Sequence, residues 1–135
     1  MLNKIREKTE PYFERLGKAL GNVIPHPRVW SISGLTFAFF AAYGFYVKVP
    51  FYAGILILIS GFFDIVDGAV ARSLGKAGPK GAFLDSNLDR ISELVIYVGI
   101  LMGGYVEPVL VFLVASFSLL VSYARAVSYT HLRAH

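Results

Sequence analysis

With 135 residues the chain has room for one domain, and the absence of cysteine excludes disulfides, thiolate metal sites and cysteine nucleophiles. Hydrophobic residues make up 56% of the chain and its mean hydropathy is +0.59, which favours a membrane protein over a water-soluble one. The formal net charge is +4, but the positive residues lie between apolar runs, so we attribute them to membrane topology and expect no nucleic-acid partner.

The N-terminal segment, residues 1–20, carries charges throughout and lacks the apolar core of a signal peptide. Residues 2–20 predict a juxtamembrane amphipathic helix that lies in the membrane interface, with a candidate break near Pro11. Its apolar side chains would face lipid, and its Lys and Arg side chains would meet headgroups. A solvated helix or a mobile tail is the alternative, and Pro25 and Pro27 then interrupt the chain.

Four apolar runs follow, and each is long enough to cross a hydrocarbon core of roughly 30 Å as a helix. They span about residues 28–47, 51–72, 81–104 and 107–127. No strand-like alternation interrupts them. The sequence therefore predicts an all-α fold: a polytopic transmembrane bundle of four membrane helices in residues 21–127, following the interfacial helix.

Positive charge predicts the orientation of this bundle. The N-terminal segment and the 72–80 loop carry nearly all the Lys and Arg, whereas the two opposite loops hold only Lys48. The positive-inside rule then places the N-terminus and the 72–80 loop in the cytoplasm, in an integral protein of the cell membrane. Polar residues from three helices would meet at that cytoplasmic level: Asp64, Asp67, Asp85, Asp89 and Arg125.

The four carboxylates predict a metal site. Asp64 and Asp67 are three residues apart, and Asp85 and Asp89 are four apart, so on helices each pair shares one face. Carboxylates that face one another repel unless cations or protons lie between them. Oxygen ligands suit Mg²⁺ or Mn²⁺, and we expect two such ions bridging to substrate phosphates.

Small residues and one arginine beside the first carboxylate pair point to a phosphate ligand. Gly68 and Ala71 remove bulk, and Arg72 offers a planar fork for a phosphate. Three alternatives stay open at this point. The small residues would serve helix packing, Arg72 would anchor the helix in the cytoplasm, or the carboxylates would line an ion path through a carrier or channel.

The spacing of these residues resembles the signature of the CDP-alcohol phosphotransferases. That signature reads D-x-x-D-G-x-x-A-R, eight residues, then G-x-x-x-D-x-x-x-D, and every fixed position matches between Asp64 and Asp89. The stretch PRVWSISGL from Pro27 is similar to the start of the family's first membrane helix, with Arg28 in place of the usual Asn. The resemblance implies a six-helix membrane enzyme, usually a homodimer, that cleaves a CDP-linked lipid.

The resemblance also implies roles for individual residues. Asp64, Asp67, Asp85 and Asp89 would hold the metal ions, and Asp89 would also be the catalytic general base on the acceptor hydroxyl. The CDP pocket would be formed by Asp64, Gly68, Ala71, Arg72 and Gly81. CMP would leave as the acceptor attacks the lipid-side phosphorus.

Further likeness concerns the substrates. The stretch DSNLDRISE from Asp85 resembles the inositol-phosphate branch of the family, in which Arg90 and Arg125 would bind the acceptor phosphate. Val127 stands where that branch has a second basic residue. Glycerol 3-phosphate is the rival acceptor, and the donor would be CDP-diacylglycerol or CDP-archaeol.

The last residues depart from the family pattern. The segment VSYTHLRAH from Val127 is neither apolar enough to span a membrane nor a natural stop. We therefore expect a truncated core in residues 21–127 and a non-native tail in residues 128–135, and a truncation of this kind can abolish activity. His131 and His135 are four residues apart but lack a neighbouring carboxylate, which argues against a metal site there.

Overall fold

The computed structural model describes residues 2–133, and within them it consists of helices and short connections, without strands. The helices are α1 (Leu2–Val23), α2 (Pro27–Tyr46), α3 (Pro50–Ser73), α4 (Pro79–Gly103) and α5 (Pro108–Arg133). The predicted all-α fold is therefore confirmed. The predicted foreign tail overlaps the end of α5, and residues 134 and 135 of it lie outside the described part of the chain.

Proline marks the start of each of the last four helices. Pro27, Pro50, Pro79 and Pro108 are the first residues of α2 to α5, where their fixed φ suits a helix and their missing N–H removes no bond. Gly104 ends α4 with a left-handed φ of 68°. Each end of these four helices thus lies within about two residues of its predicted position, except the end of α5.

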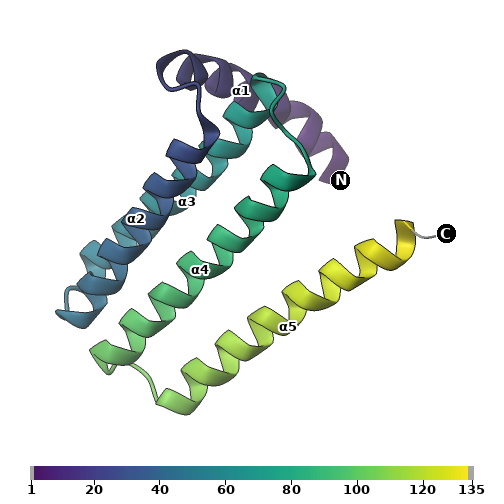
Figure 1. Ribbon diagram of the computed structural model, residues 1–135. Coiled ribbons are helices and arrows are strands. Elements are labelled where there is room, and N and C mark those ends of the chain that lie inside the picture. Colours follow the sequence, from purple (N-terminus) through teal and green to yellow (C-terminus); the bar gives the residue numbers. More distant parts are fainter. Residues whose placement is uncertain (1, 134–135) are drawn as a thin grey trace.

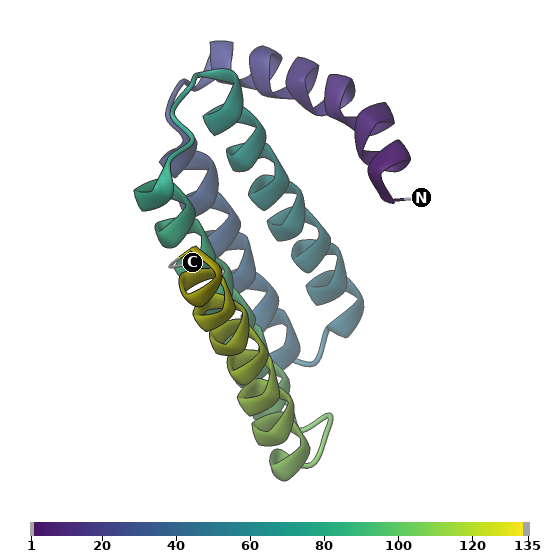
Figure 2. The same ribbon diagram turned by 90° about the vertical axis from the view of Figure 1, so that its right-hand side faces the viewer.

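Helix α1 is continuous, contrary to the suggested break at Pro11. Pro11 lacks a backbone N–H, so one carbonyl of the preceding turn loses its hydrogen bond. Because Pro11 is exposed, water can bond this carbonyl instead. Figures 1 and 2 show α1 lying across one end of the bundle, against the C-terminal end of α3. Contact is close there, because a Cβ on Gly17 would collide with the backbone of Ala69.

Helix α2 forms the centre of the fold, with α3 on one side and α4 on the other (Figures 1 and 2). Glycines allow the close approach: a Cβ on Gly44 would lie 3.1 Å from Ala53 Cβ, and one on Gly99 would lie 2.5 Å from Ala42 Cα. Small residues at helix contacts are typical of membrane bundles, in which van der Waals packing drives association. Helix α5 packs chiefly on α4.

Among the described residues, three helices are long and apolar enough to cross a membrane. They are α2, α3 and the Pro108–Thr130 part of α5, so the chain has the character of an integral membrane protein. Helix α4 falls outside this group because Lys80, Asp85, Asp89, Arg90 and Glu93 lie along it. A fourth membrane helix and the interfacial position of α1 therefore stay predictions.

Candidate active site

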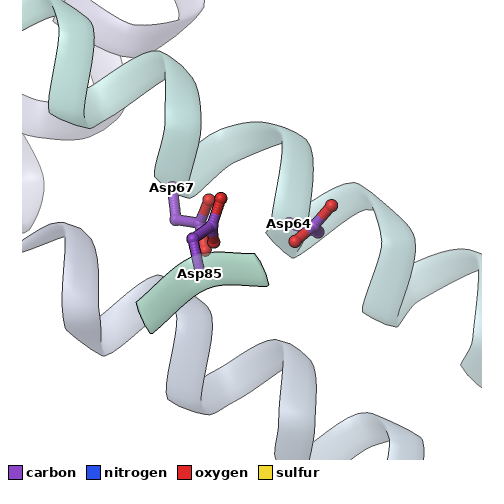
Figure 3. A group of neighbouring side chains, drawn as sticks. All are labelled: Asp64, Asp67 and Asp85. Carbon is purple, nitrogen blue, oxygen red and sulfur yellow. The ribbon is translucent and has the colours of Figure 1, made fainter. Parts of the chain in front are cut away.

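Three carboxylates converge between α3 and α4. Asp64 and Asp67 lie one helical turn apart on α3, and Asp85 reaches toward them from the first part of α4 (Figure 3). Each offers an oxygen, and these oxygens all lie within 4.8 Å of one another. Such a separation is short for three like charges, so the arrangement calls for a cation or a proton between them.

Asp67 is the most buried member of this group, with only 2% of its surface exposed. Its Oδ2 accepts a hydrogen bond of 2.5 Å from Ser31 Oγ on α2. Its Oδ1 is buried without a hydrogen-bond partner among the described residues. Because a buried carboxylate oxygen without a partner is costly, Asp67 has an open ligand position in the fold.

These observations fit the metal chemistry expected from the sequence. The donor set consists of carboxylate oxygens alone, which suits hard divalent cations such as Mg²⁺ or Mn²⁺. The Oδ1 of Asp67 is a buried acceptor without a hydrogen-bond partner in the described chain, so it is available to a cation. The hydrogen bond from Ser31 holds the same carboxylate in one orientation, as residues that hydrogen-bond metal ligands commonly do.

Asp89 lies at the same cavity but has a different environment. A cavity of about 70 Å³ is bordered by all four aspartates and by Ser31, Gly34, Leu35, Ser60, Gly61, Leu88 and Ser92. The Asp89 side chain is half exposed, and its Oδ2 forms an ion pair of 2.9 Å with Arg90. Asp89 is not among the three converging carboxylates, and its carboxylate is accessible to solvent.

Gly68 and Arg72 lie together one turn beyond the carboxylates. A Cβ on Gly68 would lie 3.3 Å from a terminal nitrogen of Arg72, so the guanidinium covers this glycine. Arg72 is exposed and borders a second hollow of about 480 Å³, between α1 and the end of α3. Ala71 is half-buried, and a Cβ on Gly81 would meet only Lys76 O, at 4.0 Å. Within the described chain, therefore, packing does not require glycine at 81.

The two arginines predicted to bind an acceptor phosphate lie in different settings. Arg90 is engaged by Asp89, by Glu93 and by Ser118 Oγ of α5. Arg125 is exposed on α5 and does not border the carboxylate cavity. Neither arginine borders the cavity itself, but Arg90 pairs with Asp89, which does, whereas Arg125 has no such link within the described residues.

Ser31 is the site residue that was not singled out from the sequence. It is the first serine of the PRVWSISGL stretch, and Gly34 is the glycine of the same stretch. A Cβ on Gly34 would lie 3.3 Å from Ser60 O, and Ser60 Oγ donates a 2.8 Å hydrogen bond to Gly34 O. The glycine thus brings α2 close to α3, which lets Ser31 reach Asp67.

Comparison with known proteins agrees with this geometry. Three curated relatives carry the name archaetidylinositol phosphate synthase. The Pyrococcus horikoshii protein is 41% identical, the Methanothermobacter thermautotrophicus protein 35% and the Aeropyrum pernix protein 36%. These matches cover 93%, 93% and 79% of this chain, and 66%, 63% and 55% of the relatives, respectively. The chain therefore spans somewhat more than half to two thirds of their length.

No solved structure gives a significant match to this chain. Residues 20–135 match the sequence profile of a family described as CDP-alcohol phosphatidyltransferase, so the match includes the carboxylates, the glycines and Arg72. It also includes α5 and the residues that follow it. The chain belongs to the CDP-alcohol phosphatidyltransferase family.

Proposed function

We propose that this protein is a membrane enzyme of phospholipid synthesis. It transfers a phosphatidyl-type group from a CDP-linked lipid to the hydroxyl of a polar alcohol and releases CMP. The observation that carries the proposal is the buried, unpartnered Oδ1 of Asp67 among three converging carboxylates. A divalent cation would offset the charge of all three carboxylates and give this oxygen a partner.

Four aspartates divide the work in this proposal. Asp64, Asp67 and Asp85 hold one cation, and Asp89 shares in a second. Bound Mg²⁺ or Mn²⁺ would offset the charge of the pyrophosphate and stabilise the leaving oxygen. Asp89 acts as the general base, because its half-exposed carboxylate borders the cavity and is accessible to an acceptor hydroxyl.

The proposed transfer is a nucleophilic substitution at phosphorus. The acceptor oxygen forms a bond to the lipid-side phosphorus, and the bond from that phosphorus to the bridging oxygen breaks. CMP departs with the bridging oxygen and its electron pair, while the hydroxyl proton passes to Asp89. Every residue in this step lies on α3 or α4.

The CDP portion would lie beside Gly68, between the carboxylates and Arg72. The Arg72 guanidinium lies over Gly68, where the missing side chain leaves room for it, and it suits a phosphate oxygen. The small side chain of Ala71 leaves space beside the same stretch of α3. Gly81 at the start of α4 leaves open space for the ligand, since protein packing does not require a glycine there.

The names of the relatives favour an inositol phosphate acceptor and an archaeol-type donor. Arg90 would contact the acceptor phosphate at the edge of the cavity, with Arg125 as a second cation. Glycerol 3-phosphate as acceptor and CDP-diacylglycerol as donor are the alternatives within the same chemistry. Helix α4 would be the fourth membrane helix, α1 would lie in the cytoplasmic interface, and the whole protein would form a homodimer.

An acceptor panel tests the proposal. Purified protein in nanodiscs is given CDP-archaeol with inositol phosphate, glycerol 3-phosphate or serine, and CMP release is measured with Mg²⁺ and with EDTA. We expect Mg²⁺-dependent release with inositol phosphate above all. Release with glycerol 3-phosphate alone would overturn the acceptor assignment. Cation flux into liposomes without CMP release would favour a carrier instead.

A further inference from the structure

A polar network joins α4 to α5 beside the carboxylate cavity. Its members are Arg90, Glu93 and Tyr97 on one face of α4, at spacings of three and four residues, and Ser118 on α5. The side chains of Arg90 and Glu93 are only 31% and 27% exposed. None of the family's signature positions lies in this group, and the reaction proposed above uses only Arg90.

Each hydrogen bond of the network has a defined direction. Ser118 Oγ accepts from Arg90, at 3.0 Å, and donates to Glu93 Oε1, at 2.7 Å. The Tyr97 hydroxyl donates to the same Oε1, at 2.7 Å. Glu93 Oε2 pairs with the Arg90 guanidinium at 2.5 Å. Glu93 is therefore held by two hydroxyl groups and in turn holds Arg90.

Arg90 connects this network to the cavity. One terminal nitrogen faces Glu93 and Ser118, and the other donates to Asp89 Oδ2 at 2.9 Å. The guanidinium is thus shared between one carboxylate outside the cavity and one carboxylate at its edge. No ion pair joins Arg90 to Asp64 or Asp85 within the described residues.

We propose that Glu93 is a positioning residue that keeps the Arg90 guanidinium against α5, beside Asp89 and out of the carboxylate cavity. Without the charge of Glu93, the nearest negative charges to Arg90 would be those of the cavity itself. The guanidinium would then turn toward these carboxylates and compete with the divalent cation. The assigned role of Asp89 rests on the proposed function, but the effect on cation binding does not.

Glu93→Gln is the informative substitution, because it keeps the size of the side chain and an oxygen for Tyr97 and Ser118 while removing the charge. Glu93→Asp keeps the charge on a shorter stem and should restore part of the effect. Glu107→Gln is the matched control, since Glu107 is exposed in the short connection between α4 and α5. Ser118→Ala removes one support of Glu93 and should act in the same direction, more weakly.

The test is a double-mutant cycle read by Mn²⁺ binding. Free Mn²⁺ is measured by electron paramagnetic resonance with purified protein in nanodiscs, for wild type, Glu93→Gln, Arg90→Met and the double variant. We expect Glu93→Gln to weaken Mn²⁺ binding about tenfold, the lower end of the effects that outer residues of metal sites have on affinity. The double variant should bind Mn²⁺ as Arg90→Met does, because the competing guanidinium is gone.

Two results would overturn the proposal. One is an unchanged Mn²⁺ affinity in both Glu93→Gln and Ser118→Ala. The other is the same loss from Glu93→Gln with and without Arg90, which would mean that Glu93 acts only on the packing of α5. CMP release is measured in parallel to separate the two proposals. A wild type that binds Mn²⁺ but releases no CMP contradicts the enzyme activity, whereas the Mn²⁺ double-mutant cycle still tests the role of Glu93.

Discussion

The seam between α2 and α3 and the seam between α4 and α5 are built in opposite ways. The first is closed by small residues, with Gly34 against Ser60 and Gly44 against Ala53, and backbone meets backbone. The second is held mainly by the polar network around Glu93, and α5 otherwise presents large apolar side chains outward. Figure 1 shows the same contrast, since α2 and α3 lie close together whereas α5 leans away from the bundle.

This difference assigns different tasks to the two sides of the site. On the α2–α3 side, Asp67 is buried and fixed by Ser31, so its carboxylate is preorganised. On the α4 side, Asp89 is half exposed and its orientation depends on Arg90. A rigid half suits a cation ligand, and an accessible half suits a base that must meet a substrate hydroxyl.

The largest effect is expected at the accessible half. Asp89→Asn keeps the shape of the side chain but cannot take a proton, so CMP release should fall about 10²- to 10⁴-fold. The check is the rate of CMP release at saturating Mg²⁺, with Glu107→Gln as a control of equal chemical change. Turnover at the wild-type rate would remove Asp89 as the base.

A smaller effect on CMP release is expected from Ser31, which supports Asp67 on the α2–α3 side. Ser31→Ala removes the hydrogen bond to Asp67 Oδ2 without touching the cavity's carboxylates. The Mg²⁺ concentration for half-maximal CMP release should rise about 10- to 100-fold. Ser33→Ala on the same helix is the control, because Ser33 bonds only the backbone of its own helix in the described structure. Equal Mg²⁺ dependence of the two variants would contradict the positioning role of Ser31.

The smallest effect on chemistry is expected from the packing between α2 and α4. A side chain at Gly99 would meet the Ala42 backbone at 2.5 Å, so Gly99→Leu should destabilise the fold by about 1–3 kcal/mol. Gly54→Ala is the control, since a Cβ there has no neighbour within 4 Å. Thermal unfolding in nanodiscs measures both, and a melting temperature equal for the two would show that α2 and α4 are not closely packed.

Much of this architecture could be predicted from the sequence. Apolar runs bounded by proline and glycine predicted the helices α2 to α4, because these residues restrict where a helix begins and ends. The spacing put each pair of aspartates on one helix face, and the charge pattern predicted that the two pairs meet. Three of the four, Asp64, Asp67 and Asp85, converge in the structure.

Other features depend on contacts between helices, which local pattern does not encode. The bond from Ser31 to Asp67 arises from the close approach that Gly34 allows. The partners of Arg90 include Ser118, 28 residues away, so its engagement by the α4–α5 network could not be predicted from residues 85–93. Pro11 would weaken an isolated helix, yet α1 continues through it where the helix is exposed.

The central claim is that Asp67 holds a divalent cation in this cavity. Mn²⁺ titration followed by electron paramagnetic resonance, comparing the wild-type protein with Asp67→Asn in nanodiscs, tests it directly. We expect the wild type to bind Mn²⁺ saturably and the variant to bind it at least about 100-fold more weakly, at unchanged helix content. Equal Mn²⁺ affinity in the two proteins would contradict it.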